Sequence, residues 1–185
     1  MVSFDEGLDK AVQGAFTRPI PKTAPAQMRY LVKQHKGSTG QVAALLGITQ
    51  RTVERYVKGQ IKKPRADLAE RLAGEVTRRW QPKIRAQAKK KAASTDGLMI
   101  DTRATFGYTA APGTTDEARL RHLTLALPPQ YAARLFEAQD RGAGEERLRQ
   151  IAAEGLGHAY FRDGGRRAHD LSVELRHIEH LEFEL

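Results

Sequence analysis

Apolar residues recur every three or four positions through most of the first half of the chain, which predicts helices there. One helix is expected over residues 3–16, and the prolines at positions 19 and 21 prevent it from continuing. A second helix is expected over residues 26–34. Pro64 stands where a further helix begins, because a single apolar stripe follows it at Leu68, Leu72, Val76 and Trp80.

Residues 39–58 match the pattern of a helix-turn-helix. Gly47 tolerates a positive φ at the turn, Thr49 can cap the next helix, and the apolar spacing assigns one helical face to the core. The opposite face carries donors that bind base edges and phosphates in the major groove. The predicted base contacts are Gln50, Arg51 and Arg55, and the predicted phosphate contacts are Thr52 and Lys58. An ordinary helical hairpin with a basic face is the alternative.

The second half of the chain changes character, because apolar residues alternate with polar ones in several segments. Strands are predicted at 98–108, 123–127, 171–175 and 181–185, and helices at 130–139 and 145–161. The expected class is therefore α+β: an N-terminal all-α helix-turn-helix domain followed by a smaller antiparallel sheet domain with two helices.

Charge is distributed unevenly along the chain, whose net charge is +9. Residues 1–92 hold 20 Lys and Arg against 7 Asp and Glu, whereas residues 93–185 hold 11 against 15. This asymmetry indicates two electrostatic units. We predict a basic helical DNA-binding domain over residues 1–93, a linker at 94–97 and an α+β domain over 98–185. DNA is assigned to the first, and another partner to the second.

Residues 78–91, the basic arm, gather seven basic side chains with no acid among them. Such density suits the phosphate backbone, where each neutralised phosphate contributes about −0.9 to the salt slope of log affinity. The alternative is a solvated charged face. The predicted phosphate contacts of the arm are Arg78, Arg79, Lys83, Arg85, Lys89, Lys90 and Lys91.

Several classes of site are not expected. The chain has no cysteine, which excludes disulfides and thiolate metal sites. No apolar run is long enough to cross a bilayer, so a soluble, cytoplasmic protein is expected. No metal site is predicted: His177 and His180 lie three apart in a segment with the pattern of a strand, where they face opposite sides.

Four stretches of the chain carry a resemblance to a known family. They are KAVQGAFTRPIPKTAPAQMRYLVKQHKG, LLGITQRTVERYVKGQIKKPRADLAERL, IDTRATFGYTAAPGTTDEARLRHLTLALPPQYAARLFEAQ and IAAEGLGHAYFRDGGRRA. Together they resemble the telomere terminal proteins of Streptomyces linear chromosomes and plasmids, the Tpg family. The likeness runs over nearly the entire chain.

The resemblance implies that this protein becomes covalently attached to the 5′ ends of linear DNA, where a protein hydroxyl replaces the RNA primer. The acceptor of the family is a threonine, and the matching place is the priming loop, residues 110–117. Thr114 is the implied primer hydroxyl and Thr115 the adjacent alternative. The protein would then be the substrate that a polymerase nucleotidylates, and not an enzyme.

Other interpretations of the same residues stay open at this point. Thr114 and Glu117 have the spacing of a capping box, which can simply begin a helix. Tyr108 is a rival hydroxyl near the loop. The whole chain could instead be a helix-turn-helix transcriptional regulator or a nucleoid-associated DNA-binding protein, since both share the DNA-binding half.

The implied partners follow from this chemistry. They are telomeric DNA as a single-stranded or folded 3′ overhang, a DNA polymerase and a telomere-associated DNA-binding protein. No cofactor of its own is expected, because the polymerase supplies a divalent metal such as Mg²⁺ together with the deoxynucleotide. The expected location is the cytoplasm, at chromosome or linear-plasmid ends in the nucleoid. No membrane partner is expected, and the sequence leaves homo-oligomerisation open.

Overall fold

The computed structural model describes residues 3–109, 119–162 and 172–185. They form two compact units: a helical unit, residues 17–82, and a sheet unit, residues 1–16 and 83–185. The predicted α+β class is confirmed, with helices towards the N-terminus and an antiparallel sheet towards the C-terminus. Thr114 and Thr115 lie outside the described residues.

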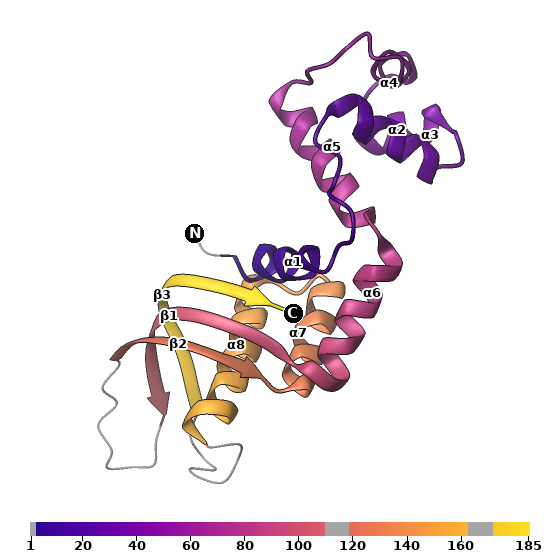
Figure 1. The fold of residues 1–185 in the computed structure, drawn as a ribbon. Coiled ribbons are helices and arrows are strands. Elements are labelled where there is room, and N and C mark those ends of the chain that lie inside the picture. Colours follow the sequence, from indigo (N-terminus) through magenta and orange to yellow (C-terminus); the bar gives the residue numbers. More distant parts are fainter. Residues whose placement is uncertain (1–2, 110–118, 163–171) are drawn as a thin grey trace. The chain divides into compact units, whose positions relative to one another are not determined.

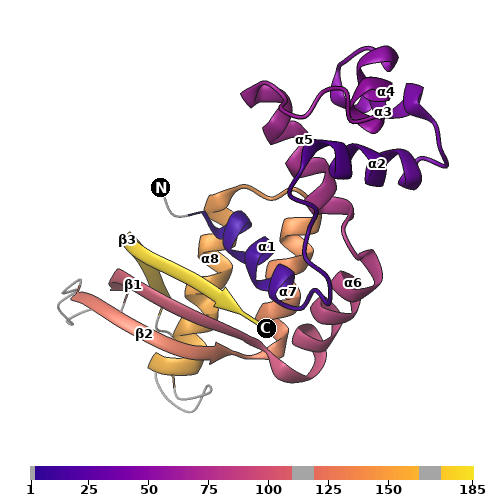
Figure 2. The same ribbon diagram turned by 45° about the horizontal axis from the view of Figure 1, so that its top comes forward.

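The helical unit contains α2 (Ala24–Gln34), α3 (Thr39–Leu46), α4 (Gln50–Val57) and α5 (Ala66–Arg79). Every one of these helices contributes to a single apolar core, in which the residues Met28, Leu31, Val42, Leu46, Val53, Leu72 and Val76 are fully buried. The stripe predicted after Pro64 is confirmed, because its first three members are buried and Trp80 packs partly buried beside them. Helices α2 and α5 lie side by side in this unit (Figures 1 and 2).

The sheet unit is built on three antiparallel strands in the order β2-β1-β3. Their bounds are Leu98–Thr109 for β1, Arg119–Leu127 for β2 and Ser172–Glu184 for β3. Alternate residues point to one face, so that Ile100 of β1 is flanked by Leu125 and Phe183. Helices α1 (Phe4–Gly14), α7 (Pro129–Asp140) and α8 (Glu145–Leu156) share a core with this face (Figure 1).

Three further helical segments complete the sheet unit. Helix α6 spans Pro82–Lys91, and a π-helical turn, η1, continues it over Ala92–Asp96. A second π-helical turn, η2 (Gly157–Phe161), extends α8. The helix predicted over 145–161 is therefore confirmed as α8 with its π-helical extension.

The C-terminal strand differs from the prediction of two separate strands. The structure has one strand, β3, interrupted by a bulge at which the register against β1 shifts between Arg103 and Thr105. His177 occupies the bulge with a φ of 45°. Arg176 pairs with Thr105 and His180 with Arg103, so β3 has two more residues than β1 over this stretch. We had predicted that His177 and His180 face opposite sides of a regular strand, but the bulge makes this part of β3 irregular.

The predicted domain boundary at residues 94–97 is wrong. The chain leaves the helical unit at residue 82 instead, and α1 belongs to the sheet unit, which is thereby the larger of the two. The physical reason is burial: Phe4, Leu8, Ala11 and Val12 of α1 lie in the core of the sheet unit. Glu145, at the start of α8, accepts hydrogen bonds from the Phe4 and Asp5 amides at 2.7 and 3.2 Å and so caps α1.

Candidate nucleic-acid interface

The turn between α3 and α4 has the local geometry that its sequence predicts. Gly47 ends α3 in the left-handed region, with φ 62° and ψ 38°, where a side chain would be strained. Thr49 is the N-cap of α4, and its hydroxyl accepts a hydrogen bond from the Thr52 amide at 3.3 Å. Ser38 caps α3 in the same way. These residues make 39–58 a helix-turn-helix in structure as well as in pattern.

The inner face of α4 is fixed in the core of the helical unit. Val53 is completely buried, and Tyr56 keeps only 4% of its surface exposed. Burial raises the pKa of the Tyr56 phenol, so the ring stays neutral at physiological pH. An aromatic ring therefore takes the place of the aliphatic residue usual in such motifs. Because this face packs in the core, the opposite face of α4 points to solvent.

The outer face of α4 presents uncompensated positive charge. Arg51, Arg55 and the C-cap residue Lys58 are exposed, and within the described chain they form no ion pair or hydrogen bond through their side chains. Arg51 and Arg55 are one helical turn apart and so lie on the same side of α4. Guanidinium groups in this arrangement can donate two hydrogen bonds each to the acceptor edge of guanine.

Gln50 and Thr52 are already engaged inside the motif. The Gln50 amide nitrogen donates to the Thr39 hydroxyl at 3.0 Å and to the Glu54 carboxylate at 3.1 Å. Both hydrogens of that amide are thus used, and its oxygen can still accept a hydrogen bond from a base. The Thr52 hydroxyl lies 2.8 Å from that of Thr49. The structure therefore gives Gln50 a second role, since it links α3 to α4.

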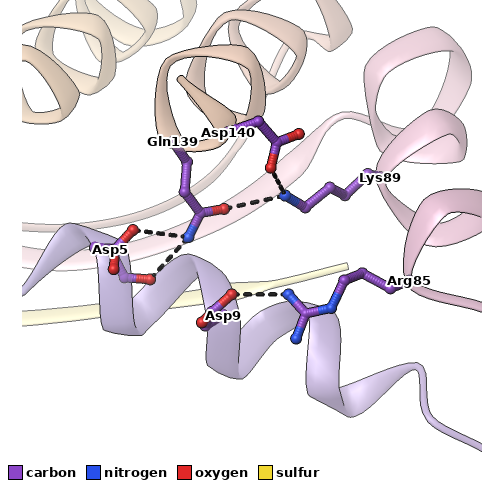
Figure 3. A network of polar contacts seen from close by, with 6 residues as sticks. All are labelled: Asp5, Asp9, Arg85, Lys89, Gln139 and Asp140. Atoms are coloured by element: carbon purple, nitrogen blue, oxygen red, sulfur yellow. Dashed lines mark hydrogen bonds and ion pairs between the residues drawn. The ribbon is translucent and has the colours of Figure 1, made fainter. Parts of the chain in front are cut away.

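The basic arm is divided between the two units. Arg78 and Arg79 belong to the helical unit and both pair with Glu75, whereas the rest of the arm belongs to α6 and the sheet unit. Arg85 Nη1 contacts Asp9 at 2.8 Å and Lys89 Nζ contacts Asp140 at 2.7 Å (Figure 3).

The two α6 contacts are largely enclosed. The Arg85 and Lys89 side chains retain only 15% and 14% of their exposure. Gln139 completes this network, because it accepts from Lys89 and donates to Asp5 (Figure 3). We therefore correct the sequence prediction that Arg85 and Lys89 contact phosphates. Their charges form ion pairs within the sheet unit, which hold α6 against α1 and α7.

The other basic residues of α6 are more accessible. Lys83 and Lys90 are exposed, and neither forms an ion pair within the part of the chain described here. Lys91 is exposed and pairs with Asp96 at 2.7 Å. These three residues remain predicted phosphate contacts.

The structural boundary sharpens the charge asymmetry. The helical unit, residues 17–82, contains 14 Lys and Arg against 4 Asp and Glu and has a net charge of +10. The rest of the chain is close to neutral, with 17 against 18. Attraction to a polyanion is therefore concentrated in the unit that carries α4.

The predicted primer residues Thr114 and Thr115 lie outside the described part of the chain, within residues 110–118. In sequence they fall between β1 and β2, which are antiparallel neighbours. His122 is the histidine nearest in sequence to Thr114, and its Nε2 lies 2.9 Å from Asp101 Oδ1, which His180 also contacts at 3.1 Å. A hydrogen bond from Thr124, then one from His122, lowers the pKa of Asp101.

Comparisons with known proteins add no identification. None of the described helices combines the length and the apolar character that crossing a membrane requires. No family model matches the chain, and no curated protein and no solved structure is similar enough to it to be a match.

Proposed function

We propose that this chain binds DNA through α4 and serves as a terminal protein that primes DNA synthesis at the ends of a linear replicon. The observation that carries the DNA-binding part is the geometry of α4. Its inner face is buried, its start is capped by Thr49, and Arg51 and Arg55 stand exposed and unpaired among the described residues.

The charge of the helical unit supports the same proposal. Its net charge of +10 draws it to a polyanion regardless of sequence, while the side chains of α4 select among sequences. Each well-placed bidentate contact to a base discriminates by about 1–3 kcal/mol. Two arginines one turn apart can thus distinguish a preferred site from random DNA by roughly 2–6 kcal/mol, about one to four decades of affinity.

The priming part rests on the family resemblance of the sequence. In the proposed reaction the Thr114 oxygen attacks the α-phosphorus of a deoxynucleoside triphosphate. A phosphodiester forms between threonine and nucleotide, pyrophosphate leaves, and the hydroxyl proton passes to solvent or to a base in the polymerase. Metal ions of the polymerase stabilise the charge that develops on the phosphates. The chain supplies the alcohol and the polymerase supplies the catalysis.

The two parts of the proposal need each other. A protein primer must be present at the end of the DNA when replication arrives there, and sequence-selective binding provides this placement. A DNA polymerase and a telomere-associated DNA-binding protein are the proposed partners, because the hydroxyl has to enter a polymerase site at a single-stranded or folded 3′ overhang. The proposed location is therefore the end of the chromosome or linear plasmid.

Binding-site selection from a random duplex library tests the DNA-binding part. The wild-type protein should enrich one sequence, and Arg51→Ala or Arg55→Ala should each lose about 1–3 kcal/mol of preference for it. Lys58→Ala is the matched control, because a phosphate contact weakens binding to all sequences equally. If Arg51→Ala and Arg55→Ala behave like Lys58→Ala, α4 does not contact bases.

A nucleotidylation assay tests the priming part. Protein, host polymerase, terminal template, Mg²⁺ and labelled deoxynucleotide should give labelled protein. Thr114→Ala should lose the label, while Thr114→Ser and Thr115→Ala should keep it. Strong base should release the label, because threonine phosphodiesters undergo elimination and tyrosine ones resist it. Absence of label with every template and polymerase would leave a transcriptional regulator or a nucleoid-associated protein.

A further inference from the structure

We infer that a groove in the helical unit, separate from the exposed face of α4, binds the sugar-phosphate backbone of DNA. The groove has a volume of about 710 Å³ and lies between the start of α2, the segment after α4, and α5. We name it the basic groove after its charged lining residues, Lys22, Arg29, Lys62 and Lys63. The inference rests on the proposed DNA-binding function and specifies a second contact for it.

The charge of the basic groove is not neutralised within the protein. None of its lining residues is acidic. Lys22, Lys62 and Lys63 are exposed and form no ion pair within the described ranges of the chain. Arg29 donates from Nε to the Pro25 carbonyl at 3.2 Å, a contact that orients its guanidinium and leaves its charge unpaired among the described residues.

Three other basic residues of the same unit do have acidic partners. Arg71 pairs with Asp67 at 3.1 Å, and both Arg78 and Arg79 pair with Glu75. The basic groove is distinguished by having four cations without an acidic partner among the described residues around one hollow. Bringing like charges together costs free energy, which a bound anion offsets.

The basic groove also has an apolar part. Small apolar side chains line it, namely Ala24, Pro25, Ala69 and Ala73. They offer no hydrogen bond through their side chains, but they allow close approach of a flat or ribbon-like ligand. A deoxyribose ring is largely apolar on its faces and is flanked by charged phosphates. This pattern matches an apolar floor with a cationic rim.

The position of the basic groove along the chain suits a DNA backbone next to α4. Lys58 is the C-cap of α4, Gly59 already lines the groove, and Lys62 follows three residues later. Four residues of chain span at most about 14 Å, so Lys62 lies within that distance of the end of α4. Phosphates line both edges of the groove that holds a recognition helix. A duplex read by α4 therefore has backbone within reach of the basic groove.

The test measures how strongly salt weakens the binding of a labelled random-sequence duplex, and it compares wild type with two double variants. Wild type, Lys62→Gln with Lys63→Gln, and a control double variant, Arg141→Gln with Arg147→Gln, are titrated between about 50 and 200 mM salt. The control removes the same charge from exposed positions of the sheet unit. Loss of two phosphate contacts should reduce the slope of log affinity by about 1.8, while the control should keep the wild-type slope.

A second pair of measurements separates a DNA backbone from free phosphate compounds. Ala73→Glu places a carboxylate on the floor without removing a cation, and it should weaken duplex binding as well. Inorganic phosphate and a deoxynucleoside triphosphate, added as competitors at fixed ionic strength, should displace little DNA. Efficient displacement by either, together with a wild-type slope in the double lysine variant, would overturn the inference in favour of a site for free anions.

The outcomes for the two proposals are distinguishable. If the wild-type protein does not bind duplex or overhang DNA at all, the proposed function fails. If the wild type binds DNA normally and Lys62→Gln with Lys63→Gln leaves the slope unchanged, only the basic groove is refuted. Circular dichroism of each variant checks that these exposed substitutions leave the fold intact.

Discussion

Removing the Glu145 carboxylate should destabilise the sheet unit by detaching the first turn of α1. This carboxylate accepts hydrogen bonds from the Ser3 hydroxyl at 2.7 Å and from the Phe4 and Asp5 amides at 2.7 and 3.2 Å. It therefore satisfies two backbone donors that the start of a helix leaves open. Loss of a helix cap costs about 0.5–2 kcal/mol, and three bonds to a solvent-exposed carboxylate place Glu145→Ala at about 1–2 kcal/mol.

Thermal unfolding followed by circular dichroism measures this effect. For a unit of this size, about 1–2 kcal/mol corresponds to a decrease of roughly 4–8 °C in Tm. Glu146→Ala is the matched control, because Glu146 occupies the same first turn of α8, is exposed and pairs only with Arg149 among the described residues. It should shift Tm by less than about 2 °C.

The difference in Tm between wild type and Glu145→Ala should depend on pH, because the stabilisation depends on the ionisation of Glu145. Burial alone raises this pKa, but hydrogen bonds from Ser3, Phe4 and Asp5 outweigh burial and lower it below its ordinary value of 4.5. The stabilisation is thus fully present above about pH 4.5 and is lost as pH falls through the lowered pKa. The gap in Tm between wild type and Glu145→Ala should close in acid. Equal Tm values for the two alanine variants at neutral pH would refute the capping role.

Three further predictions concern the helical unit and α6. Gly47→Ala should destabilise the helical unit by about 1 kcal/mol because φ is positive there, whereas Gly74→Ala, inside α5 with open space around it, should stabilise it by up to about 1 kcal/mol; chemical denaturation compares the two. Leu72→Ala should cost about 2–5 kcal/mol in the same assay, since Leu72 is fully buried. Arg85→Ala should lower Tm but leave the salt slope of DNA binding unchanged, and a slope reduced by about 0.9 would return Arg85 to the DNA contacts.

The helix-turn-helix could be predicted from sequence because its determinants are local. A glycine at the turn, a threonine cap and the spacing of apolar residues act within about 20 residues of chain, as Gly47 and Thr49 show. The secondary structure of the sheet unit could be predicted from sequence for the same reason. Alternation along β1 and β2 is a property of each strand by itself.

The assignment of α1 and α6 could not be predicted, because it depends on partners distant in sequence. Glu145 lies 141 residues from Phe4, whose amide it caps, and Asp9 lies 76 residues from Arg85. Composition shows that residues 78–91 are basic, but it does not show which acids the fold brings to them. The continuity of β3 was hidden because the apolar alternation lapses between Leu175 and Leu181, where the bulge lies.

The basic groove was missed for a related reason. Lys62 and Lys63 stand together in sequence, but Lys22 and Arg29 come from a different part of the chain. Only packing of α2 against α5 brings the four together. The adjacent lysines after Gly59 were the one signal available, and without the fold they resemble any exposed pair of lysines.

The most direct test of the whole account is a mass spectrum of the protein attached to the ends of the linear DNA in its host, recovered by nuclease digestion. The account predicts peptides of this chain, with a single nucleotide linked to Thr114. Ends that carry no peptide of this chain, or a nucleotide on a tyrosine such as Tyr108, would contradict it.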